Sequence, residues 1–275
     1  ADTDSFDAHG RRALHDAVFA EHKECVDMLL RAGASQICFS TAENSLTALG
    51  LAIFNRRAIM TRFLATHELV DVNETFHFND NHNPLTLAVS CSNDELPCVE
   101  ALLKSNTLQI DKAHECSGIE RVNALTIAVD LGYLDLVKLL LAHGADPDHL
   151  YAGHLIPLLV LAAGRGHTRI LRALMAAGAE ISSCDAEGHS PLWTAEEYKM
   201  TACANALRLE MAKRVPTVET AETVDEEAAR LAVGDHLDGA EHAFAAHFAD
   251  MRVIGQRVAH GAHEVGTGVA GVLHQ

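Results

Sequence analysis

Histidine is the residue type in this sequence with the greatest capacity for chemistry. The chain has 18 histidines among its 275 residues, and an imidazole can bind zinc or exchange a proton near neutral pH. His260 and His263 stand three residues apart, and His242 and His247 precede them. A zinc site needs three or four converging ligands, usually including cysteine or carboxylate, and this spacing supplies no such set. We therefore expect no metal site.

The cysteines and the catalytic motifs lead to the same expectation. The seven cysteines are scattered without a Cys-x-x-Cys pair, which is typical of thiols in a reducing compartment. Gly-x-Ser-x-Gly, a phosphate-binding glycine loop, His-Glu-x-x-His and the protein-kinase signature do not occur in the sequence. We expect no catalytic residue, no cofactor and no small-molecule substrate, and predict that the chain is not an enzyme.

A residue pattern that would position a binding surface recurs along about the first 210 residues of the chain. Its period is roughly 33 to 40 residues. One unit contains Ala128-Val129, Gly132-Tyr133, a leucine run at 139–141 and Gly144-Ala145-Asp146. Each unit predicts two short helices: an anchoring leucine opens the first, small alanines let neighbours approach, and apolar residues three and four apart mark the second. The anchors are Leu14, Leu49, Leu85, Leu125, Leu158 or Leu159, and Leu192.

Glycine is expected to end the second helix of several units. Gly33, Gly144 and Gly178 follow its last apolar residues, and glycine adopts the left-handed C-terminal cap without steric cost. One such unit cannot bury its apolar face alone, so stacking of neighbouring units must supply the core.

This pattern resembles the ankyrin repeat family over about three quarters of the chain. The family consensus combines Asp, Gly, Thr-Pro-Leu-His, Ala-Ala, Gly-His, Leu-Leu and Gly-Ala-Asp. The last copy has Asp185, Gly188 and Ser190-Pro191-Leu192, and His15 alone occupies the position of the family's His. The resemblance implies an all-α solenoid over residues 1–213, with about six helix-turn-helix repeats and β-turn fingers.

The resemblance also implies where partners bind: at the finger tips and at two variable positions near the end of each first helix. Three of the few aromatic residues, Phe19, Phe54 and Tyr198, fall on the helix positions. They either anchor a partner or are buried between repeats. The residues expected to bind protein in this region are Ala8, His9, Arg11, Phe19, Phe54, Asn55, Asp130, Leu131, Arg165, Ala186, Glu187, His189, Glu197 and Tyr198.

Charge and hydropathy restrict the partners further. The net charge is -17, with 21 Lys and Arg residues against 38 acids, so a nucleic-acid surface is not expected. No run of 18 apolar residues occurs, so no transmembrane span is expected, and the first residues lack the pattern of a secretory signal. These features favour an intracellular, reducing location, the cytoplasm first and a cytoskeletal or organellar assembly second.

The chain changes character after the repeats. Residues 214–227 are predicted to form an acidic linker, because residues 215–227 contain five acids and no base. Residues 228–275 are predicted to form a helical extension with a heptad-like apolar seam that includes Phe244, Phe248, Met251 and Val258. We expect these four residues to bind protein.

Glycines within this seam weaken an isolated helix by about 1 kcal/mol each. We therefore predict that residues 237–274 are helical only against another surface. A frayed or disordered tail is the open alternative. An interfacial membrane helix is disfavoured, because the polar side carries histidines and few cations.

Together these observations predict a non-catalytic protein-protein interaction module, acting as a scaffold or accessory subunit of a larger assembly. The alternative is a regulatory or inhibitory module that binds and blocks a soluble enzyme. A pathogen effector or a fragment of a longer enzyme also remains open.

Overall fold

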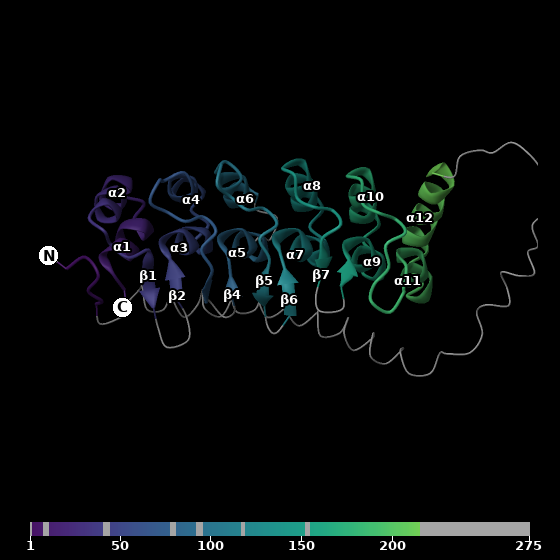
Figure 1. Cartoon of the computed structure of the whole chain (residues 1–275). Coiled ribbons are helices and arrows are strands. Elements are labelled where there is room, and N and C mark those ends of the chain that lie inside the picture. Colours follow the sequence, from purple (N-terminus) through teal and green to yellow (C-terminus); the bar gives the residue numbers. More distant parts are fainter. Residues whose placement is uncertain are drawn as a thin grey trace, which may run out of the picture.

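The computed structural model describes residues 2–7, 11–40, 45–77, 81–91, 96–116, 119–151 and 155–214. Within these residues, twelve helices form six antiparallel pairs that stack side by side (Figure 1). The first helix of each pair belongs to an inner row and the second to an outer row, and short β-hairpins project from the side of the inner row. The solenoid expected from the repeat pattern is confirmed.

The helices are short and regularly placed. The inner helices are α1 (Ala13–Phe19), α3 (Ala48–Phe54), α5 (Pro84–Ser90), α7 (Ala124–Leu131), α9 (Leu158–Gly164) and α11 (Pro191–Glu197). The outer helices are α2 (Lys23–Arg31), α4 (Ala58–Ala65), α6 (Pro97–Leu102), α8 (Leu134–Ala142), α10 (Thr168–Ala176) and α12 (Thr201–Arg214). Isolated helices of this length are marginal in water, so their stability comes from packing between the pairs.

Four of the fingers contain antiparallel strand pairs rather than simple turns. The strands are β1 (Ile37–Ser40) with β2 (Ser45–Thr47), β3 (Phe76–His77) with β4 (Asn81–His82), β5 (His114–Cys116) with β6 (Ile119–Val122), and β7 (Leu150–Tyr151) with β8 (Ile156–Pro157). The register brings Phe76 opposite His82 and Tyr151 opposite Ile156. The all-α class therefore holds for the stack, and the fingers add a small β component to it.

A polar side chain starts most inner helices. Thr47 accepts a hydrogen bond from Gly50 N at 3.1 Å, and Asn123 accepts one from Thr126 N at 2.8 Å. Ser190 caps α11 through Trp193 N, and Asn83 forms a reciprocal capping box with Thr86. These side chains satisfy backbone donors that have no partner within the helix.

Glycine ends three outer helices, as the sequence predicts. Gly33, Gly144 and Gly178 have φ values of 83°, 89° and 101°, which is the left-handed conformation of a C-terminal cap. The chain then crosses to the next finger.

The core runs continuously through the stack. The anchoring leucines Leu14, Leu49, Leu85, Leu125, Leu158 and Leu159 are all at most 2% exposed. The six predicted alanines of the inner helices are also buried: Ala17, Ala52, Ala88, Ala128, Ala162 and Ala195. Leu192, the last predicted anchor, is only partly buried, because α11 packs against an inner helix on one side only.

Loop side chains also join neighbouring repeats. Asn73 Oδ1 accepts a hydrogen bond from Gln109 N at 2.8 Å, and Asp148 Oδ1 accepts one from Glu180 N at 2.8 Å. Asp111 accepts from Asp146 N at 3.1 Å. These contacts fix the spacing of consecutive loops, and hence the positions of the fingers. Among the helices of the described residues, none has the length and apolar character needed to cross a lipid bilayer.

Candidate protein-binding surface

The last residue of a typical inner helix and the residue after it occupy equivalent positions in all six repeats. We call these twelve residues the loop row: Phe19, Ala20, Phe54, Asn55, Ser90, Cys91, Asp130, Leu131, Gly164, Arg165, Glu197 and Tyr198. They include every helix position that the sequence predicts to bind protein. The register predicted from the repeat pattern therefore matches the helix ends of the structure.

A left-handed residue follows the loop row in five repeats. It is glycine in two of them, Gly132 at φ 80° and Gly166 at φ 72°. In the other three it is Glu21 at 58°, Arg56 at 56° and Lys199 at 57°. A side chain costs about 1–2 kcal/mol in this conformation, so these turns carry backbone strain next to the candidate surface.

The first two repeats present an aromatic and cationic group. The Phe19 ring stacks on His15, with ring centroids 6.3 Å apart and an interplanar angle of 5°. Arg57 Cζ lies 6.0 Å from the centroid of the Phe19 ring, within the usual range of a cation–π contact. Burial lowers the pKa of His15, so its ring is neutral at neutral pH.

Phe54 and Cys91 continue this part of the row. Phe54 is half-buried and packs against the hydrophobic core, so it combines a structural role with an exposed edge. Burial raises the pKa of the Cys91 thiol to about 11, which keeps it protonated at neutral pH and poor as a nucleophile. The aromatic residues are thus neither fully exposed nor fully buried, between the two alternatives that the sequence left open.

Asp130 and Arg165, two predicted binding residues, contact each other across the interface of the fourth and fifth repeats. Asp130 Oδ1 lies 2.7 Å from Arg165 Nη2 and 2.8 Å from Arg165 Nε. Both side chains are only about 15% exposed. Burial raises the pKa of Asp130, although the Arg165 charge and hydrogen bond oppose this. This pair therefore joins the fourth and fifth repeats, and a role of either residue in binding a partner stays a prediction.

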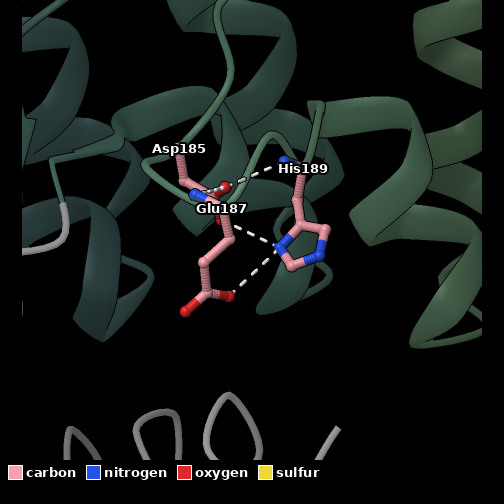
Figure 2. A group of neighbouring side chains, drawn as sticks. All are labelled: Asp185, Glu187 and His189. Carbon is pink, nitrogen blue, oxygen red and sulfur yellow. Dashed lines mark hydrogen bonds and ion pairs between the residues drawn. The ribbon is translucent and has the colours of Figure 1, made fainter. Parts of the chain in front are cut away.

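The finger of the sixth repeat brings two further predicted residues together (Figure 2). His189 Nδ1 lies 3.4 Å from Glu187 Oε2 and 3.2 Å from Asp185 Oδ2. Asp185 is buried, and its Oδ1 accepts hydrogen bonds from Glu187 N at 3.0 Å and His189 N at 2.8 Å. The buried carboxylate thus folds the finger, in which the side chain of Glu187 is exposed and that of His189 is largely covered.

These three side chains are also the one group in the described residues whose ligand atoms, within 4.8 Å of one another, could share a metal ion. The hydrogen bonds of Asp185 explain the arrangement without an ion. Both carboxylate oxygens serve the loop, and an ion bound at Asp185 would compete with these bonds. The group therefore fits a loop cap better than a metal centre.

The last repeat concentrates negative charge beside an aromatic ring. Glu197 is exposed and Tyr198 is half-buried against the core. Burial raises the pKa of the Tyr198 hydroxyl, and the carboxylates of Glu197 and Glu187 raise it further. The finger and the loop row of this repeat therefore form one acidic surface, whereas exposed Arg56 and Arg57 make the surface of the second repeat cationic.

The remaining predicted residues have more limited roles or lie elsewhere. Arg11 is held by Asp7 through an Nη2–Oδ2 contact of 2.8 Å, and Asn55 Nδ2 donates to Leu51 O at 2.9 Å. Ala186 is exposed in the last finger. Residues Ala8, His9, Phe244, Phe248, Met251 and Val258 lie outside the described residues.

The sequence pattern did not predict the left-handed residue that follows the loop row in each of five repeats, nor that this position contacts a side chain of the next repeat in several of them. Glu21 Oε1 lies 2.9 Å from Arg57 Nη1. A Cβ on Gly132 would lie 2.9 Å from His167 Cε1, and one on Gly166 would lie 2.8 Å from Met200 Sδ. The left-handed turn at Arg56 could not be predicted, because left-handed residues are usually glycine.

Comparison with protein-family models identifies this arrangement. The model of ankyrin repeats in three copies matches residues 14–115 and 125–215. The chain belongs to the ankyrin repeat family. Ankyrin repeats are generally protein-protein interaction modules, and the family is typically non-catalytic.

Solved structures support the same fold. The chain is similar to the ankyrin repeat domain of Bcl-3, a member of the IkappaB protein family, with 25% identity and a TM-score of 0.63 over 75% of this chain and 86% of that one. It also resembles an ankyrin repeat domain from Acinetobacter baumannii, with 20% identity and a TM-score of 0.58 over 72% and 97% of the two chains. The ankyrin repeat protein EF0377 gives 23% identity and a TM-score of 0.57 over 74% and 98%. The last two likenesses indicate the fold alone.

Proposed function

We propose that this ankyrin repeat protein is a scaffold or accessory subunit of a larger protein assembly and binds its partner through the loop row. The observation that carries the proposal is the alignment of half-buried aromatic and charged side chains at equivalent repeat positions. Such residues lose less conformational freedom on binding than mobile ones, and aromatic and arginine side chains dominate interface energies.

The charge distribution indicates which charges a partner carries and in which orientation it binds. Arg56 and Arg57 lie next to the row in the second repeat, and Glu187, Glu196 and Glu197 lie in the sixth repeat. A partner with acidic groups near the second repeat and basic groups near the sixth would bind in one orientation. We place this interaction in the cytoplasm, or in a cytoskeletal or organellar assembly, in keeping with the thiol content of the sequence.

The test is capture of partners by the full chain from native extract, with two matched double variants. Phe19→Ala with Arg57→Glu alters the loop row at Phe19 and the guanidinium that contacts its ring, whereas Met28→Ala with Arg62→Glu truncates another apolar side chain and makes the same charge reversal on exposed parts of the outer helices α2 and α4. The proposal predicts that the first double variant loses the partner and the second retains it, at equal melting temperature. Equal capture by both variants would contradict it.

The composition of the captured material distinguishes a scaffold from an inhibitor. A stoichiometric assembly of several proteins supports the scaffold. A single soluble enzyme whose activity falls when this chain is added would instead support an inhibitory module.

A further inference from the structure

The turn after α4 lacks the glycine that ends three other outer helices. α4 ends at Ala65, and Thr66 at its C-cap has φ -107° instead of a left-handed value. His67 closes the turn instead. Its Nδ1 accepts a hydrogen bond from Leu69 N at 3.2 Å, and its carbonyl oxygen accepts one from Val70 N at 3.1 Å. The conformation of this turn therefore depends on an imidazole.

Both nitrogens of the His67 ring have a partner, and this fixes the tautomer of the neutral ring. Nε2 lies 3.0 Å from Asp27 Oδ1 of α2. A carboxylate only accepts hydrogen bonds, so Nε2 carries the proton, and Nδ1 carries none when it accepts from Leu69 N. The His67 side chain is only 6% exposed, and its ring meets that of Phe63 edge-on at a centroid distance of 5.7 Å. Water therefore has little access to either nitrogen.

The first repeat holds three consecutive residues of this turn. α2 and α4 lie next to each other in the outer row (Figure 1). Besides the contact of α2 with His67, Arg31 Nη1 lies 3.0 Å from Glu68 Oε1, and Gln36 Nε2 donates to Leu69 O at 2.6 Å. The turn is therefore part of the joint between the first two repeats.

The charged groups around the ring come from both repeats. Asp27 contacts the ring from α2, Arg31 Nε of the same helix lies 2.9 Å from Asp27 Oδ1, and Glu68 is the next residue of the turn. The hydrogen bond from His67 and the Arg31 guanidinium hold the pKa of Asp27 below its usual value, so this carboxylate is ionised at neutral pH. It keeps its contact with His67 in both charge states of the ring, because Nε2 carries a proton in both.

Protonation of His67 therefore acts at Nδ1. An imidazolium donates through both nitrogens, so Nδ1 no longer accepts from Leu69 N, and two N–H groups face each other across this 3.2 Å contact. The ring cannot turn away without losing Asp27, so the turn has to move. We propose that His67 is a pH-sensitive latch of the joint between the first two repeats: the neutral ring closes the turn after α4, and the imidazolium opens it.

Exchange of the Leu69 amide, followed by NMR in the full-length chain from about pH 8 to about pH 5, tests this latch. Histidine exchanges its proton in this range, and the carbon signals of the His67 ring report its charge. After correction for the intrinsic pH dependence of exchange, protection of the Leu69 amide is expected to fall about fivefold as the ring is protonated, which is the loss typical of one hydrogen bond. Both changes should have the same midpoint.

Two histidine variants provide the comparison. His67→Asn does not titrate but keeps an acceptor, because an asparagine Oδ1 accepts from the amide two residues on at every pH. In this variant, protection of Leu69 should not depend on pH. His143→Asn is the control. His143 is the C-cap residue of α8, and its Nδ1 donates to Leu139 O at 2.9 Å, so protonation does not remove that bond. His143→Asn should leave the pH dependence at Leu69 unchanged.

Constant protection of Leu69 in the unmodified chain, while the His67 ring becomes protonated, would overturn the proposal. A ring that stays neutral down to about pH 5 would also overturn it, because the latch would then stay closed over the range in which histidine usually titrates. The same loss of protection in His67→Asn would have this meaning too, since the loss would not depend on an imidazole.

Discussion

Arg57 forms an ion pair with Glu21 across the interface of the first two repeats, with Nη1 2.9 Å from Oε1. The two residues belong to equivalent turns of consecutive repeats. Arg57 comes one position later in its turn than Glu21 does in its own. Glu21 is left-handed at φ 58°, and the same guanidinium approaches Phe19. In the fourth and fifth repeats a glycine takes the place of Glu21, and His167 or Met200 packs where its side chain would be. The same left-handed turn thus recurs in several repeats, with different side chains in and around it.

Lys199→Gly should stabilise the protein. Lys199 is exposed and left-handed at φ 57°, and glycine relieves that strain while increasing the entropy of the unfolded chain. The two effects leave a net gain of about 0.5 kcal/mol in the free energy of unfolding. Urea unfolding of Lys199→Gly and Lys199→Ala measures it. The alanine variant should match the unmodified protein, and a loss of stability with glycine would show that the turn is not strained.

Gly132→Ala should destabilise the protein more than Gly144→Ala. Both glycines are left-handed, at φ 80° and 89°, so both substitutions cost about 1–2 kcal/mol in the backbone. A Cβ on Gly132 would also lie 2.9 Å from the His167 ring, whereas Gly144 has nothing within 4 Å of that position. Displacing His167 adds about 1 kcal/mol. Equal losses in thermal unfolding of the two variants would mean that the ring moves aside freely.

Arg165→Ala should cost about 3 kcal/mol of folding stability, because it leaves the Asp130 carboxylate in a poorly solvated position. The double variant Asp130→Asn with Arg165→Ala should recover part of the loss, since it removes the charge that lacks a partner. Urea unfolding of both single variants and the double variant measures this coupling. Additive losses would show that the 2.7 Å contact contributes little.

The same carboxyl predicts a pH dependence. Burial raises the pKa of Asp130 above its ordinary value, so the folded state binds this proton more tightly than the unfolded state does. Its contribution to stability is fully present below the unfolded pKa and is lost as the pH rises through the folded pKa. The free energy of unfolding of the unmodified protein, minus that of Asp130→Asn, should therefore fall over this acidic window. A difference that rises with pH would indicate that Arg165 dominates over burial.

The fold could be predicted because its signals are local and repeated. Leu14, Leu49 and Leu125 are buried where the period predicts, and Gly33 caps its helix with the expected left-handed φ. Each repeat makes most of its contacts with its neighbours, so a periodic sequence specifies most of the architecture.

The departures depend on contacts between repeats, which a linear pattern does not show. Gly50 stands where the family has His, and the structure explains it: a Cβ there would lie 3.0 Å from Phe76 of the next finger. Asp130 and Arg165 were predicted to bind a partner. They stand 35 residues apart in the sequence, and the stacking of their two repeats brings the side chains into contact. Which positions of consecutive loops contact each other depends on how the repeats stack in three dimensions.

The central claim is that a partner binds along the loop row, and hydrogen–deuterium exchange of the full chain, free and bound to its captured partner, tests it most directly. Binding is predicted to slow amide exchange in the turns around Phe19–Glu21, Phe54–Arg57 and Glu197–Lys199, and to leave the exposed sides of α2, α4 and α10 unchanged. Protection confined to these outer helices, with the turns unaffected, would contradict the claim.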